Sequence, residues 1–154
     1  MIRTLAFLTI AFILIWACND NAADTATERK NGYTPVLKDK GDSLYHEVMK
    51  GHDTGMAKWG QLTGAIKKVD AGIDSIAKSK KPDTQFQSTL KTLQEDLTQA
   101  EYGMNTWMTE FKADTLQDDK DKRATYLEAE LMKVNKVKER ILTSLARFDS
   151  LYKK

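Results

Sequence analysis

The stretch that decides the fold lies near the C-terminus, where residues 127–145 read LEAELMKVNKVKERILTSL. Its apolar side chains recur at steps of three and four residues: Leu127, Leu131, Val134, Val137, Ile141 and Leu145. This spacing places them along one face of a helix. The pattern continues through Phe148 to Leu151 or Tyr152, and the period of two that a strand requires is absent. The stretch therefore predicts a long amphipathic helix.

Two earlier segments repeat this spacing. The first contains Leu44, Val48, His52, Met56, Trp59, Leu62, Ile66, Val69, Ile73 and Ile76, and the second contains Phe86, Leu90, Leu93, Leu97, Ala100, Met104, Trp107 or Met108, and Phe111. Lys81-Pro82-Asp83-Thr84 separates them, with Pro and Asp placed to begin the second helix. The Asp-rich residues 113–122 precede the third helix, where acidic groups suit the helix dipole. Short connections between long helices predict an all-α fold, an elongated, coiled-coil-like antiparallel three-helix bundle over residues 39–154.

The first predicted helix is rich in glycine. Gly51 and Gly55 lie toward its apolar face, whereas Gly60 and Gly64 lie on the opposite face. Each interior glycine costs about 1 kcal/mol of helix stability relative to alanine. We expect a weak helix; the alternative is a hinge or a docking groove. The Gly51/Gly55 surface also offers a place for self-association, although the sequence does not determine the oligomeric state.

The N-terminus has the layout of a targeting signal. Arg3 precedes thirteen residues, Leu5 to Ala17, in which Thr9 is the only polar side chain, and Cys18 follows. Residues 1–17 are therefore predicted to be a signal peptide, since this run is too short to span a bilayer as a helix. Residues 18–38 are mostly polar, and we expect a flexible tether.

The segment Leu14-Ile15-Trp16-Ala17-Cys18 resembles a bacterial lipobox. The resemblance implies that the chain is cut before Cys18 and that a covalent lipid is attached to this residue, which makes the protein a lipid-anchored membrane protein of the cell envelope. Several acyl chains on one residue give stable anchoring, because each buried CH₂ contributes about 0.8 kcal/mol. A secreted protein with Cys18 near the cleavage site by chance, and an uncleaved anchor helix, are the alternatives.

Composition and motifs exclude several functions. The chain has 24 basic and 22 acidic residues, so we expect no nucleic-acid partner, which would require a strongly basic face. A single Cys excludes an internal disulfide framework. No phosphate-binding glycine loop, G-x-S-x-G or H-E-x-x-H motif is present, and we expect no enzyme. Glu128, Glu130 and Glu139 are interpreted as charges of a solvated helix face.

One cluster of side chains is a candidate for metal chemistry. Counting from a turn near residue 80, antiparallel pairing sets Met56 opposite Met104 and His52 opposite Met108. Thioether and imidazole groups together suit Cu(I), and an aromatic ring, Trp59 or Trp107, can shield such an ion. This composition is similar to the Met, His and Trp sites of periplasmic copper chaperones. The alternative is ordinary core packing, in which Met gains from contact with aromatic rings. His46 points away from this cluster and is expected at the solvent edge.

A wider resemblance covers most of residues 44–150. Glu47-Val48-Met49, His52-Asp53, the Met104-x-x-Trp107-Met108-x-x-Phe111 block and Tyr126-Leu127 resemble a group of small, uncharacterised helical lipoproteins of Bacteroidetes-type bacteria, sometimes labelled viral A-type inclusion proteins. This resemblance implies lipid anchoring and a helical domain, without an activity. We therefore expect a lipid-anchored envelope protein, facing the periplasm or the cell surface, whose non-catalytic bundle binds or scaffolds an envelope protein partner. The alternative is a periplasm-facing protein that binds Cu(I) through the Met/His cluster.

Overall fold

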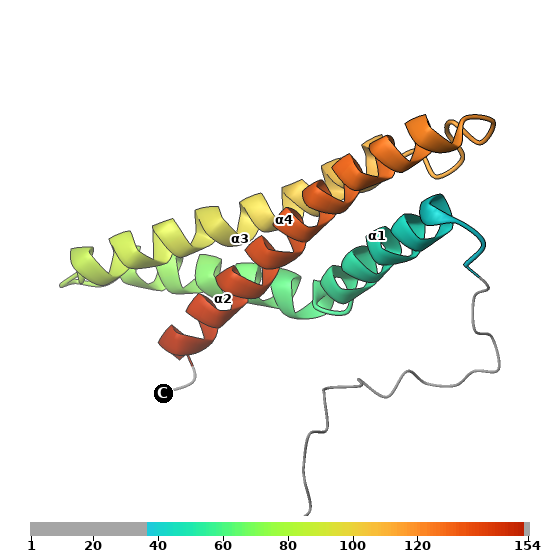
Figure 1. The fold of residues 1–154 in the computed structure, drawn as a ribbon. Helices are drawn as coiled ribbons and strands as arrows, with labels where there is room; N and C mark the ends of the chain where they lie inside the picture. The colour runs from blue at the N-terminus through green and yellow to red at the C-terminus, as the bar shows by residue number, and fades with distance from the viewer. Residues whose placement is uncertain (1–36, 153–154) are drawn as a thin grey trace, which may run out of the picture. The chain divides into compact units, whose positions relative to one another are not determined.

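The computed structural model describes residues 37–152, and these form four helices without a strand. In chain order they are α1 (Lys40–Met56), α2 (Trp59–Ala77), α3 (Thr84–Glu110) and α4 (Lys120–Tyr152) (Figure 1). The all-α helical bundle predicted from the periodicity is confirmed. The predicted signal peptide, Cys18 and the predicted tether up to residue 36 lie outside the described residues.

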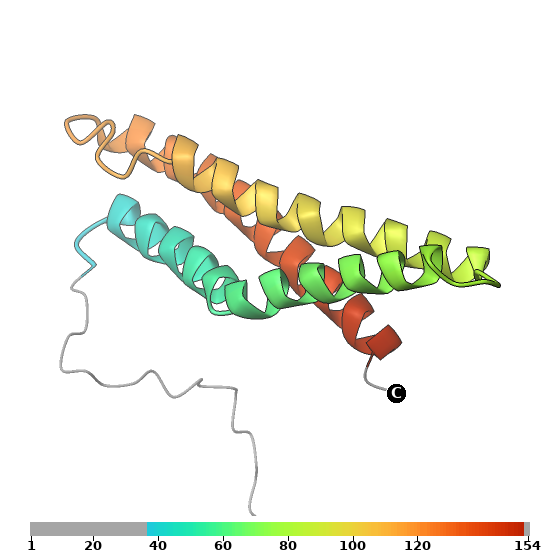
Figure 2. The same cartoon turned by 180° about the vertical axis from the view of Figure 1, so that it is seen from behind.

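The first predicted helix differs from expectation because it is divided into α1 and α2. At the division the Lys58 N–H donates to Gly55 O (3.0 Å), which lies three residues earlier instead of four. The α-helical pattern resumes at Leu62, whose N–H donates to Lys58 O (2.9 Å), four residues earlier. Gly55 and Gly60 flank the division, and glycine has little preference for the helical backbone. Figure 2 shows α1 and α2 meeting at an angle. The pattern of apolar residues runs through the bend, which is why periodicity alone predicted one helix.

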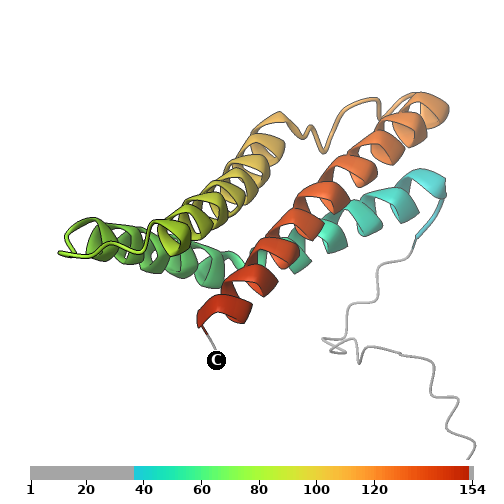
Figure 3. The same cartoon turned by 90° about the vertical axis from the view of Figure 1, so that its left-hand side faces the viewer.

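Because of the bend, α1 and α2 pack on different helices. α1 packs mainly on α4, α2 packs mainly on α3, and α3 also packs on α4. α3 runs antiparallel to its neighbours, while α1 and α4 run in the same direction (Figures 1 and 3). The core contains side chains from all four helices: Val48, Leu62, Val69, Leu90, Leu93, Leu97, Met104, Leu127, Val134 and Ile141. Phe86, expected on the same stripe, is 40% exposed at the first turn of α3.

Three helices begin at an aspartate whose side chain accepts a backbone N–H. Asp39 accepts from Asp42 (3.0 Å), Asp83 from Phe86 (2.9 Å) and Asp119 from Lys122 (3.1 Å). Each carboxylate satisfies an N–H that lacks a partner within the helix and lies favourably in the helix dipole. The helix start predicted at Asp83 is confirmed.

The glycines of α1 are covered by the chain itself. A Cβ at Gly51 would lie 3.0 Å from Val134 Cγ1, and a Cβ at Gly55 would overlap Met104 Cε, so both positions are filled by neighbouring side chains of α4 and α3. The interpretation of the Gly51/Gly55 surface as a self-association site is therefore wrong, because α3 and α4 already bury it. Gly60 and Gly64 face open space, as expected.

Candidate functional site

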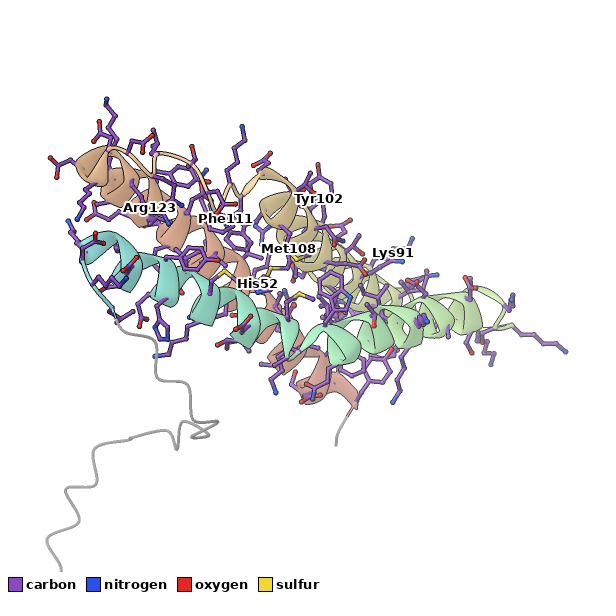
Figure 4. All side chains as sticks on the ribbon, turned by 90° about the vertical axis from the view of Figure 1, so that its right-hand side faces the viewer. His52, Lys91, Tyr102, Met108, Phe111 and Arg123 are labelled. Atoms are coloured by element: carbon purple, nitrogen blue, oxygen red, sulfur yellow. The ribbon has the colours of Figure 1, made fainter. Side chains whose placement is uncertain are left out.

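Facing turns of α1 and α3 bring His52 and Met108 into contact. His52 Nε2 lies 3.4 Å from Met108 Sδ, and Figure 4 shows the two side chains next to each other. The His52 side chain is 20% exposed, so one edge of its ring reaches solvent. The predicted register, which set His52 opposite Met108, is confirmed.

The second ring nitrogen of His52 is held by its neighbour in sequence. His52 Nδ1 lies 2.9 Å from Asp53 Oδ1. An ionised carboxylate only accepts hydrogen bonds, so this contact favours the forms of the ring in which Nδ1 carries a proton. The contact with Asp53 also orients the ring.

The other two residues of the predicted ligand set lie one helical turn away. Met104, one turn before Met108 on α3, is fully buried, and its methyl end occupies the space left by Gly55 on α1. Met56 lies in the last turn of α1, one turn after His52, and packs partly buried against the core. Cys18, the predicted lipid attachment site, falls outside the described residues.

Aromatic rings flank the His52–Met108 contact. The Trp107 ring lies 5.7 Å from the His52 ring and stacks on Phe111 at 4.9 Å between centroids. Tyr45 of α1 and Tyr126 of α4 stack on Phe111, each at 6.3 Å. Of the two tryptophans considered from the sequence, Trp107 is the one beside His52, whereas Trp59 packs partly buried at the start of α2.

A buried carboxylate on the other side of Trp107 was missed by the sequence analysis. Glu130 is 4% exposed, and its Oε2 accepts a 2.9 Å hydrogen bond from Trp107 Nε1–H. Its Oε1 accepts from Lys133 Nζ (2.8 Å), and this hydrogen bond raises the Lys133 pKa above its ordinary value. The interpretation of Glu130 as a solvated-face charge was wrong. The available signal was its position between Leu127 and Val134, on the apolar face of α4.

The remaining sequence predictions in this region concern exposed groups. His46 is 36% exposed, and its ring nitrogen lies 3.7 Å from Glu47, which confirms its position at the solvent edge. Glu128 and Glu139 are exposed, as expected. Lys40 forms a 2.6 Å ion pair with Glu128 between α1 and α4.

A groove of about 330 Å³ follows the line between α3 and α4. Tyr102, which is 65% exposed, lies at this groove together with Gly103 of α3 and with Lys136, Val137 and Arg140 of α4. The groove thus combines an accessible aromatic ring, an aliphatic surface and cationic groups. Aromatic and arginine side chains are enriched where proteins bind other proteins.

Two further findings apply to the part of the chain that the structure describes. Within residues 37–152, no three or more His, Cys, Asp and Glu side chains gather into a group that could hold a metal ion. In the same range, every helix is too short or too polar to cross a bilayer. Comparison with known proteins finds no matching family model, no matching curated protein and no matching solved structure.

Proposed function

We propose that this chain is a lipid-anchored protein of the bacterial cell envelope whose helical domain binds another envelope protein without catalysing a reaction. The anchor part of the proposal depends on Cys18, which directly follows a thirteen-residue apolar run with Arg3 before it. A lipid on Cys18 would hold the domain at the membrane, and residues 18–38 would separate the two.

The groove between α3 and α4 is the observation that carries the binding part of the proposal. An exposed tyrosine such as Tyr102 supplies a large contact area with few rotatable bonds, and Arg140 beside it offers planar hydrogen-bond donors. The sequence lacks the catalytic motifs considered above, so binding is the activity that these side chains support best. The protein partner is therefore expected to contact Tyr102 directly.

The anchor is tested by labelling cells with an alkyne-bearing fatty acid and comparing the natural chain with Cys18→Ser. We expect label on the natural chain and its recovery with membranes, and the loss of both in Cys18→Ser. Label that persists in Cys18→Ser, or membrane association independent of this residue, would contradict lipidation at Cys18.

The binding surface is tested by placing a photo-crosslinking amino acid at Gln99, which lines the groove, and at Glu47, an exposed control on α1. In the native cells, we expect a discrete crosslinked protein from Gln99, its loss when Tyr102→Ala is added, and no such product from Glu47. Equal crosslinking from both positions, or a product indifferent to Tyr102→Ala, would argue against the groove as the binding surface.

A further inference from the structure

The contact between His52 and Met108 joins two electron-pair donors. When Asp53 accepts a hydrogen bond from Nδ1–H, a neutral His52 ring presents the lone pair of Nε2, and this atom lies 3.4 Å from Met108 Sδ. The thioether sulfur also carries lone pairs and has no proton to donate. In this form of the ring two Lewis bases are in contact at a partly buried position, an arrangement that a cation bound by both would stabilise.

The separation of these two atoms matches the spacing of ligands on one metal ion. Metal–nitrogen and metal–sulfur bonds of about 2.0 and 2.3 Å, at a tetrahedral angle, place the two ligand atoms about 3.5 Å apart. The observed distance is 3.4 Å.

The surroundings of His52 follow the pattern of a metal-binding histidine. Such a residue almost always donates its second ring N–H to a carboxylate or a carbonyl, which orients the ring and increases its basicity. Asp53 Oδ1 fills this role at 2.9 Å. The same contact keeps the Asp53 carboxylate on the Nδ1 side of the ring, away from Met108.

The ligand types select the metal. Nitrogen and thioether ligands suit Cu(I), whereas Ca²⁺ and Mg²⁺ require oxygen ligands. A third thioether is near, since Met104 lies one turn before Met108 and reaches α1 at Gly55.

We propose that His52 Nε2, Met108 Sδ and Met104 Sδ bind one Cu(I) ion between α1 and α3, a function beyond the protein-binding role proposed above. Trp107, whose ring lies 5.7 Å from that of His52, packs beside the site. The 20% exposure of His52 provides the route by which the ion enters. Burial of Met104 and Trp107 limits contact of the bound ion with water and oxygen.

The test is a titration of the full-length chain with Cu(I), under anaerobic conditions in detergent, against the chelator bicinchoninate. All variants carry Cys18→Ser, because a free thiol would itself bind Cu(I). We expect one Cu(I) per chain, with one nitrogen and two sulfur ligands by X-ray absorption. His52→Gln, Met108→Leu and Met104→Leu should each weaken binding by about tenfold or more, and Asp53→Asn by about tenfold, as second-sphere changes do.

Two matched controls separate ligation from general effects. His46→Gln and Met132→Leu make the same chemical changes at His46, which is 36% exposed, and at Met132, which is 70% exposed, and both should bind Cu(I) like the parent. Helicity and urea midpoints verify that every variant is folded; Met→Leu keeps the core volume. Failure of the parent to compete with the chelator, or equal affinity across folded variants and controls, would overturn the proposal and leave His52 and Met108 as packing residues.

Discussion

Two glycine-to-alanine substitutions, one in α1 and one in α2, are expected to change the free energy of unfolding by different amounts. Gly51 lies inside α1 and Gly64 inside α2, and a Cβ at Gly64 would meet nothing within 4 Å. A Cβ at Gly51 would lie 3.0 Å from Val134 Cγ1 and 3.3 Å from Asn135 Oδ1. The chemical change is identical, so the surroundings decide the outcome.

The magnitudes follow from helix propensity and packing. Alanine in place of an interior helical glycine contributes about 1 kcal/mol, so Gly64→Ala should raise the free energy of unfolding by this amount. At Gly51 the same gain is opposed by overpacking, which costs about 1–3 kcal/mol. Val134 is fully buried and β-branched, so its methyl group cannot rotate away. Because the propensity gain cancels in the comparison, Gly51→Ala should be about 1–3 kcal/mol less stable than Gly64→Ala.

Urea unfolding followed by circular dichroism measures both free energies in the full chain. In a Val134→Ala background, which removes the opposing methyl groups, Gly51→Ala is expected to become stabilising. Equal stability of Gly51→Ala and Gly64→Ala would refute the reasoning, since it would mean that α1 and α4 do not approach as closely as the structure places them. A Gly51→Ala penalty that survives in the Val134→Ala background would refute the assignment of the cost to this contact.

Three further predictions concern the polar groups. Glu130→Ala leaves the buried Trp107 Nε1–H without its acceptor, and urea titrations should show a free energy of unfolding lower by about 1–3 kcal/mol. Glu130→Gln keeps an acceptor oxygen, so this variant should lose less stability. The pKa of Asp39 is held below its ordinary value of 3.8, first by the hydrogen bond from the Asp42 backbone N–H and second by the one from Lys120. This carboxylate therefore contributes stability above pH 3.8, and the contribution is lost as pH falls through the folded-state pKa. Asp39→Asn keeps the helix cap and should therefore show a smaller loss of the urea midpoint between pH 5 and pH 2, and an unchanged acid profile would contradict this role. Arg123→Ala removes two hydrogen bonds to the carbonyls of residues 113 and 115, so amide hydrogen exchange should accelerate over residues 111–119 and remain unchanged in α3.

The sequence predicted those features that depend on periodicity and connection length. Steps of three and four residues identify the helices, and the position of the turn near residue 80 set His52 opposite Met108. The division between α1 and α2 was not predictable in this way, because Met56, Trp59 and Leu62 continue the apolar pattern through it. Such a bend depends on the preference of each half for a different partner helix, which is information carried by the tertiary contacts.

The burial of Glu130 shows a different limit. An acidic residue on a long helix is solvated in most proteins, and its burial requires hydrogen-bond donors. Lys133 on the same helix supplies one donor to Glu130, and the other comes from a different helix. That donor, Trp107 Nε1–H, lies on α3, 23 residues earlier in the chain. Periodicity within one helix contains no information about this pairing, so the interaction becomes visible only when α3 and α4 are placed together.

Trp107 connects the register of the bundle to the geometry of the candidate copper site. Its indole N–H donates to Glu130 of α4, and its ring lies beside His52 of α1. A slip of α4 by one turn, about 5.4 Å, would separate the Glu130 carboxylate from the Trp107 N–H, which is unfavourable for two buried polar groups. The Trp107–Glu130 hydrogen bond therefore favours one register of α3 against α4. α1 packs mainly on α4 as well, so α4 is the helix against which both proposed ligands, His52 of α1 and Met108 of α3, are placed. Both lie within helices, so their positions do not depend on a loop.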